Sequence, residues 1–340
     1  MTVSENYQVH QFGNVELQSG ELLPDAFLAY KTYGKLDNTA SNVIVLPTFY
    51  TGSHERNEGF FGPGRAIDPD RHFIVSINLF GNGISSSPSN TPPPFDGPRF
   101  PRVSLWDNIA CQHTLLTEVL GVEQIALVAG WSMAGCQAYQ WAAQYPDMVQ
   151  AIIPFCASAK TSAHNTVFLE GVKAALQADG NWHDGDYTQP PVAGLRAFGR
   201  VYAGWAFSQT FYRNGLYQKL GYKTYNDLLD DWAEDHAQNW DANNLLAKLD
   251  TWQRGDISAN RLYDGNFEAA LKAIKAQVIV IPSSSDLYFP PEDNMIEVQH
   301  IPQADLRTFE SDWGHCVANP GNEPKFEQFL DKCIRELIDQ

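Results

Sequence analysis

The chain has 340 residues, of which 44% are hydrophobic and 19% are charged, a composition typical of a globular protein that buries a sizeable core. Its formal net charge of −17 argues against nucleic acid or an anionic membrane as a partner. The cysteines are scattered, and no apolar run reaches the length of a membrane span, so we expect a cytoplasmic protein without a disulfide framework or a zinc site.

The first part of the chain alternates predicted strands with predicted helices. Two strands near the start, at residues 9–12 and 27–33, predict an antiparallel beginning. Short apolar runs without polar interruption follow, as is typical of strands buried on both faces of a sheet, at residues 42–47, 72–80, 125–129 and 149–156. Several of these runs are separated by segments in which apolar residues recur at the spacing of a helix. We therefore expect a mostly parallel sheet with helices on both faces.

The pattern changes after residue 157. No buried strand is predicted over residues 158–275, where the helical stretches are rich in aromatic residues. The strand pattern resumes at residues 278–282 and 306–310, and an amphipathic helix closes the chain at 323–338. This indicates an α/β core of residues 1–157 and 276–340 with an inserted helical cap of residues 158–275. A separate helical domain is the alternative.

One serine lies where the pattern of apolar residues changes abruptly from that of a strand to that of a helix. The segment Gly130-Trp131-Ser132-Met133-Ala134 joins an apolar strand to a helix rich in small residues. A tight strand-to-helix turn that exposes a nucleophilic serine needs small residues two positions before and after that serine. Glycine and alanine occupy those positions here. The alternative is a turn in which the serine only caps the helix.

A nucleophilic serine needs a histidine base, and that histidine needs a carboxylate to orient it. In one large class of serine hydrolases the chain order is serine, then an acidic residue, then histidine, with each residue after a strand. Asp286 directly follows the predicted strand 278–282, and His315 follows the strand 306–310. The sequence therefore predicts a triad of Ser132, Asp286 and His315.

Competing residues exist for the last two positions. Asp305 and Asp312 also lie late in the chain, although an aspartate in a loop is most often a turn former. His300 precedes the last predicted strand and so lies at the wrong end of it. Seven more histidines lie upstream of Asp286, and each is more typical of a surface or core position.

Two backbone N–H groups are expected to bind the oxyanion of the reaction. One belongs to Met133, which follows the predicted nucleophile, and the other belongs to the loop after an early strand. That loop follows the strand 42–47, and Tyr50 is the predicted donor, with a simple aromatic turn as the alternative. No dinucleotide or phosphate-loop motif is present, so neither a cofactor nor a metal is expected.

Several further motifs extend over nearly the whole chain. They are Thr51-Gly52-Ser53-His54, the segment 62–68, Ser132-Met133 with Gln137-Ala138, Tyr145-Pro146 and Trp240-Asp241-Ala242-Asn243. Together these motifs resemble the homoserine O-acetyltransferase family, a branch of the α/β-hydrolase superfamily. The resemblance implies the α/β-hydrolase fold and the same three catalytic residues. It also implies a homodimer built through the cap.

The chain departs from that family at positions that would contact substrate. Trp131 replaces a glycine before the nucleophile, Lys173 aligns with an arginine for the substrate carboxylate, and Cys316 replaces an aspartate for the amino group. We expect these three residues and Thr51 to contact the substrate. Because a buried zwitterion needs both of its charges met, we expect a substrate other than homoserine.

These observations lead to one main prediction and two alternatives. The main prediction is a serine hydrolase that acts on small carboxylic esters through an acyl-enzyme at Ser132, so the expected partner is a small-molecule ester or acyl donor. The first alternative is an acetyl-CoA-dependent O-acetyltransferase that acts on a small alcohol. The second is a catalytically inactive binding member of the fold.

Overall fold

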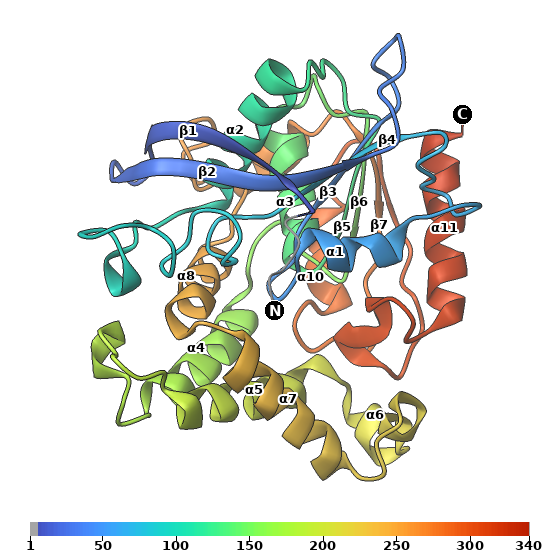
Figure 1. The fold of residues 1–340 in the computed structure, drawn as a ribbon. Helices are drawn as coiled ribbons and strands as arrows, with labels where there is room; N and C mark the ends of the chain where they lie inside the picture. Colours follow the sequence, from blue (N-terminus) through green and yellow to red (C-terminus); the bar gives the residue numbers. More distant parts are fainter. Residues whose placement is uncertain (1–5, 340) are drawn as a thin grey trace.

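The computed structural model describes residues 6–339. Eight strands form one sheet in the order β1-β2-β4-β3-β5-β6-β7-β8 (Figure 1). The strands are β1 (Gln8–Glu16), β2 (Leu22–Tyr33), β3 (Val43–Pro47), β4 (Phe73–Ile77), β5 (Leu127–Trp131), β6 (Ala151–Phe155), β7 (Gln277–Val280) and β8 (Ala304–Leu306). The pairs β1–β2 and β2–β4 are antiparallel, and all the others are parallel. This confirms the predicted fold class, including the antiparallel start.

Helices connect the parallel strands and cover the sheet. They are α1 (His54–Asn57), α2 (Leu105–Thr114), α3 (Met133–Gln144), α4 (Ala163–Gln177), α5 (Val192–Ala206), α6 (Gln209–Arg213), α7 (Tyr225–Asn239), α8 (Ala242–Gln253), α9 (Phe267–Lys272), α10 (Pro291–Glu297) and α11 (Pro324–Ile338). Shorter turns are η1 (Glu58–Phe60), η2 (Gly97–Arg99), η3 (Leu115–Val119), η4 (His183–Gly185), η5 (Leu216–Leu220) and η6 (Gly314–Ala318). Of the described helices, none has both the length and the apolar character that crossing a membrane requires.

The central strands are buried on both faces because alternate residues point to opposite layers. In β5, for example, Val128 packs into one apolar layer while Leu127 and Ala129 pack into the other. The first layer contains Ile109 of α2 and Trp141 of α3, and the second contains residues of α11 and continues into the cap. The sheet is therefore covered on both sides, as the uninterrupted apolar runs predicted.

The described residues between β6 and β7 contain helices and no strand of the sheet. In Figure 1, α4, α5, α6 and α7 lie together below the sheet, with α8 between them and the core. The proposed cap boundaries at residues 158 and 275 stay a prediction. Helix α9 falls inside that range, yet its Ala270 and Leu271 pack in the apolar layer beside the sheet.

The structure differs from the expected elements near the end of the chain. Strand β8 covers only Ala304–Leu306, upstream of the predicted 306–310, and Phe309 pairs with Ser283 only through an isolated bridge. The short helices α9 and α10 were not predicted. They are too short for a clear helical periodicity, and they are stabilised mainly by packing, which a local pattern does not reveal.

Candidate active site

Ser132 lies at the turn between β5 and α3 in a backbone conformation that L-residues rarely adopt, with φ 59° and ψ −131°. Gly130 explains why the turn needs small neighbours. A Cβ atom at this position would lie 2.3 Å from the carbonyl carbon of Ala134 and 2.4 Å from its oxygen. The serine is 3% exposed, and its amide donates to the Phe155 carbonyl of the adjacent strand at 3.0 Å. The neighbouring strand thus holds the strained residue in place.

His315 and Asp286 are brought together from two different loops. His315 belongs to η6, and its Nδ1 donates to Asp286 Oδ2 at 2.7 Å. The other carboxylate oxygen accepts backbone N–H groups of Tyr288 at 2.7 Å and Phe289 at 3.2 Å. Because the carboxylate accepts from Nδ1, the neutral imidazole presents a bare Nε2, as a general base requires.

The competing acidic residues do not take this position. Asp305 pairs with Arg307 at 2.7 Å, and its side chain is 58% exposed. Asp312 contributes its backbone carbonyl to a hydrogen bond from Ser208. The structure therefore gives His315 the carboxylate that the chain order predicted.

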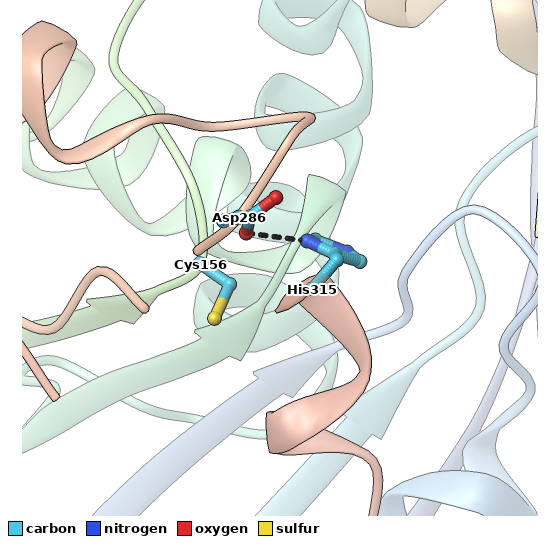
Figure 2. A group of neighbouring side chains, drawn as sticks. All are labelled: Cys156, Asp286 and His315. Atoms are coloured by element: carbon cyan, nitrogen blue, oxygen red, sulfur yellow. Dashed lines mark hydrogen bonds and ion pairs between the residues drawn. The ribbon is translucent and has the colours of Figure 1, made fainter. Parts of the chain in front are cut away.

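Cys156 completes a compact group with these two residues (Figure 2). The ligand atoms of Cys156, Asp286 and His315 lie within 4.8 Å of one another, a set of side chains that could suit a metal ion. Burial raises the pKa of the Cys156 thiol well above its usual range, and the charge of Asp286 raises it further. The thiol is therefore protonated at neutral pH when no metal is bound.

Ser132 and His315 line the same cavity, which has a volume of about 630 Å³. The core contributes aromatic and small side chains, and the cap covers the opposite side with residues of α5 and α7. Lining residues from the cap are Tyr202, Ala206, Phe207, Leu220, Tyr222, Asp231, Trp232, Glu234, Asp235, His236, Gln238, Asn239 and Trp240. The pocket therefore joins the reactive residues to a cap surface that is partly aromatic and partly acidic or amide-bearing.

Tyr50 and Met133 stay the predicted donors of the oxyanion site. Tyr50 lines the cavity in the loop after β3, and Met133 is the first residue of α3. Within residues 6–339, the backbone N–H of neither residue has a protein acceptor. Backbone N–H groups without a protein acceptor are the kind of donor that can stabilise a tetrahedral oxyanion.

The residues expected to contact substrate divide into two groups. Thr51, Trp131 and Cys316 line the cavity. Lys173 does not: its Nζ lies 3.6 Å from Glu170 one turn earlier in α4, and the residue lines a separate depression beside α8. The structure thus does not bring Lys173 together with the candidate triad.

Arg56 is a cavity residue that the sequence reasoning missed. It lies above the Phe49 ring, 4.8 Å from the centroid, and donates to Asn319 at 2.6 Å. Its proximity in the chain to the Tyr50 loop is the only local signal, because a lone arginine carries no spacing pattern. The polar cap residues of α7 were likewise hidden, since their position depends on how the cap packs.

The fold and the site geometry define an α/β-hydrolase with an inserted helical cap. The chain belongs to this family: the family model described as alpha/beta hydrolase fold matches residues 42–318. The chain is therefore an α/β-hydrolase enzyme.

Two individual relatives show which kinds of α/β-hydrolase this chain is similar to. The ethyl acetate hydrolase of Pseudomonas veronii is 35% identical over 335 residues, which are 98% of this chain and 95% of that protein. The homoserine O-acetyltransferase of Trichormus variabilis is 31% identical over 318 residues, which are 88% of this chain and 86% of that protein. This confirms the resemblance inferred from the motifs.

A solved structure agrees in detail with the fold. The structure of the acetyl esterase MekB superimposes with a TM-score of 0.94 and 34% identity, covering 98% of this chain and 97% of that chain. Similarity to esterases thus extends over the core and the cap together. Sequence and structure comparisons both place this chain among the esterases of the α/β-hydrolase family.

Proposed function

We propose that this protein hydrolyses small carboxylic esters with a short acyl group such as acetyl, with Ser132, His315 and Asp286 as its catalytic triad. The observation that carries the proposal is the buried Asp286–His315 hydrogen bond at 2.7 Å beside a cavity that also contains Ser132. The names of the relatives, ethyl acetate hydrolase and acetyl esterase, support the acyl group.

In the first half-reaction, the Ser132 hydroxyl attacks the ester carbonyl carbon and its proton passes to His315 Nε2. Asp286 orients the imidazole and stabilises its positive charge. The tetrahedral oxyanion accepts from the N–H groups of Tyr50 and Met133. The bond to the alcohol oxygen then breaks, and His315 returns the proton to the leaving alcohol.

In the second half-reaction, His315 removes a proton from a water molecule, which attacks the acyl-serine carbonyl. The bond to Ser132 breaks, His315 protonates the serine oxygen, and the carboxylic acid leaves. The sequence of steps consumes one water and returns every enzyme group to its starting protonation state.

Aromatic side chains beside the serine support a short acyl group. Phe49 and Trp131 lie with ring centroids 4.7 Å apart, and both line the cavity next to Ser132. Cys316 presents an uncharged side chain, because burial raises the pKa of its thiol. The uncharged Cys316 thus offers no carboxylate to a substrate amino group at this position, and the carboxylates that line the cavity belong to α7 of the cap.

A fluorophosphonate probe tests the nucleophile. We expect a single adduct on Ser132, mapped by peptide mass spectrometry, and hydrolysis of p-nitrophenyl acetate that falls at least about 10⁴-fold in Ser132→Ala. A folded protein that takes no label at Ser132 would refute the serine chemistry. Inert simple esters, with CoA released from acetyl-CoA only when an alcohol is added, would instead establish an O-acetyltransferase.

Location and assembly belong to the same proposal. A cytoplasmic location is supported by the five cysteines, all of them free and buried. The net charge of −17 favours a small molecule over nucleic acid or a membrane surface as partner.

A homodimer through the cap is supported by two exposed valines, Val167 of α4 and Val201 of α5. Light scattering after size exclusion tests it, and a monomeric mass would contradict it.

A further inference from the structure

Lys248 is a completely buried cation that the proposed mechanism does not use. It lies on α8 in the cap, is 0% exposed, and does not line the active-site cavity. Its Nζ donates to the backbone carbonyl of Tyr50 at 2.6 Å. Tyr50 is the residue whose own N–H is the proposed oxyanion donor. A cap residue thus touches the oxyanion loop through its backbone.

The surroundings of Lys248 are unusual for a structural lysine. Among residues 6–339, it forms no ion pair with a carboxylate within 4.0 Å. Its Nζ lies instead over the rings of Trp240 and Tyr50, at 4.3 Å and 5.1 Å from their centroids. An ammonium group without a counter-ion is costly to bury, and aromatic faces offset only part of that cost.

Burial lowers the pKa of Lys248 to about 7. The amine retains N–H donors in both protonation states, so the bond to the Tyr50 carbonyl persists through neutral pH and is stronger in the charged form. A methionine of similar volume would fill the same space without the desolvation cost. Burying the lysine therefore costs stability, and among the residues that the structure describes the one polar group that its Nζ binds is the Tyr50 carbonyl.

The oxyanion loop is held from two sides. Gln137 of α3, the helix that follows the candidate nucleophile, donates to the Thr48 carbonyl at 2.9 Å. From the cap, Lys248 holds the Tyr50 carbonyl, and the Tyr50 hydroxyl donates to the Leu245 carbonyl of the same helix at 2.8 Å. The peptide that carries the Tyr50 N–H also carries the Phe49 carbonyl, which accepts from Gly52 N–H at 2.9 Å. The Tyr50 carbonyl belongs to the next peptide, so the bond from Lys248 restricts the backbone on the other side of the Tyr50 Cα atom.

We propose that Lys248 is a positioning residue for the oxyanion site: its hydrogen bond fixes the peptide that follows Tyr50 and so limits the backbone rotation of the residue whose N–H binds the reacting oxygen. The inference rests on the proposed ester hydrolysis. It makes the cap part of the catalytic apparatus, because one of the two oxyanion donors is oriented from α8. An oxyanion donor contributes most in the transition state, so a misaimed donor lowers kcat more than it raises KM.

The test compares Lys248→Met with Lys272→Met, which removes an exposed lysine on α9 that pairs with Glu268. For p-nitrophenyl acetate, we expect kcat of Lys248→Met to fall about 10- to 100-fold with KM within about twofold of wild type. Methylboronic acid forms a tetrahedral adduct with the serine, and its dissociation constant, measured by calorimetry, should rise by a similar factor. Lys272→Met should match wild type in all three quantities.

Two outcomes overturn the inference. One is a folded Lys248→Met protein with unchanged kcat and boronate affinity, and the other is a raised KM at unchanged kcat, which would make Lys248 a residue that only holds the cap. If Lys248→Met does not fold, Lys248→Gln, whose shorter chain cannot maintain the same bond, replaces it under the same criteria. Failure of the proposed function is distinct, because wild type itself would then show no ester turnover.

Discussion

The indole of Trp131 stacks on the imidazole of His315, with ring centroids 5.3 Å apart and an interplanar angle of 28°. Tyr288 contacts the same imidazole, with centroids 4.6 Å apart. The hydrogen bond to Asp286 fixes one edge of the ring, and these aromatic contacts restrict its tilt. Trp131, the residue before the proposed nucleophile, thus contacts the proposed base directly.

Trp131→Ala is expected to change the choice of acyl group. The indole borders the cavity beside Ser132, so its removal makes room for a longer acyl chain. We expect the kcat/KM ratio of p-nitrophenyl butyrate to acetate to rise about tenfold or more. The cavity left behind should lower the free energy of unfolding by about 3 kcal/mol.

Trp106→Ala is the matched control, because Trp106 lines a depression away from the active-site cavity. It should leave the butyrate-to-acetate ratio unchanged. An unaltered ratio in both variants would contradict the assignment of Trp131 to the acyl side. Loss of acetate turnover alone would indicate instead that the indole acts mainly by holding His315.

Asp286→Asn should disable the base without disturbing the fold. An amide nitrogen facing Nδ1 favours the tautomer whose Nε2 carries the proton, so His315 no longer accepts from Ser132. We expect kcat for p-nitrophenyl acetate to fall about 10³- to 10⁴-fold. Asp305→Asn, which alters an exposed aspartate paired with Arg307, should retain wild-type kcat. A large loss in Asp305→Asn and a small one in Asp286→Asn would reverse the assignment.

The sequence predicted those parts of the fold and the site that depend on local order along the chain. Asp286 and His315 were identified because each follows a strand in the expected order, and parallel strands bring their carboxyl ends to one edge of the sheet. Small errors in strand limits, as at β8, did not matter, since the loop after the strand still leads to the same edge.

The side chains that the cap contributes to the site could not be predicted in the same way. Lys173 was assigned by alignment to a helix whose rotation against the core is set by tertiary packing, and in the structure it faces Glu170. Lys248 gave a weak signal, because it shares a helical face with Leu245, Leu249 and Trp252, all buried. Its partner, the Tyr50 carbonyl, is a backbone atom far away in the chain, and no side-chain pattern points to it.

Gly130→Ala is expected to disrupt the turn at Ser132. The added Cβ would meet the Ala134 backbone at 2.3 Å and 2.4 Å, and a backbone cannot move aside as a flexible side chain can. We expect a loss of about 3 kcal/mol or more in the free energy of unfolding, together with loss of fluorophosphonate labelling.

Gly171→Ala serves as its control. Gly171 lies in α4, and an added Cβ there meets no atom within 4 Å. Alanine should therefore stabilise the helix by about 0.5–1 kcal/mol and leave labelling unchanged. Urea unfolding followed by tryptophan fluorescence measures the free energy of unfolding of both variants. If Gly130→Ala were as stable and as reactive as wild type, the close contact around Ser132 would be refuted.

Glu297 should make stability depend on pH. It is 3% exposed, accepts from Ala159 N at 2.7 Å and from Asn294 at 2.9 Å, and burial raises its pKa to about 8. The folded state therefore keeps a proton that the unfolded state loses above the ordinary glutamate pKa of 4.5. The stabilisation is fully present below pH 4.5 and is lost as pH rises to about 8, with a slope of up to about 1.4 kcal/mol per pH unit.

Glu297→Gln should remove that slope because an amide does not titrate. The variant gives up the bond from Asn294 and so should be less stable than wild type at pH 5, but the difference should shrink or reverse by pH 8. Glu292→Gln, at an exposed site on the same helix, should follow the wild-type curve. Free energies of unfolding in urea at pH 5, 6, 7 and 8 measure the effect. Parallel curves for wild type and Glu297→Gln would show that Glu297 is already ionised in the folded protein.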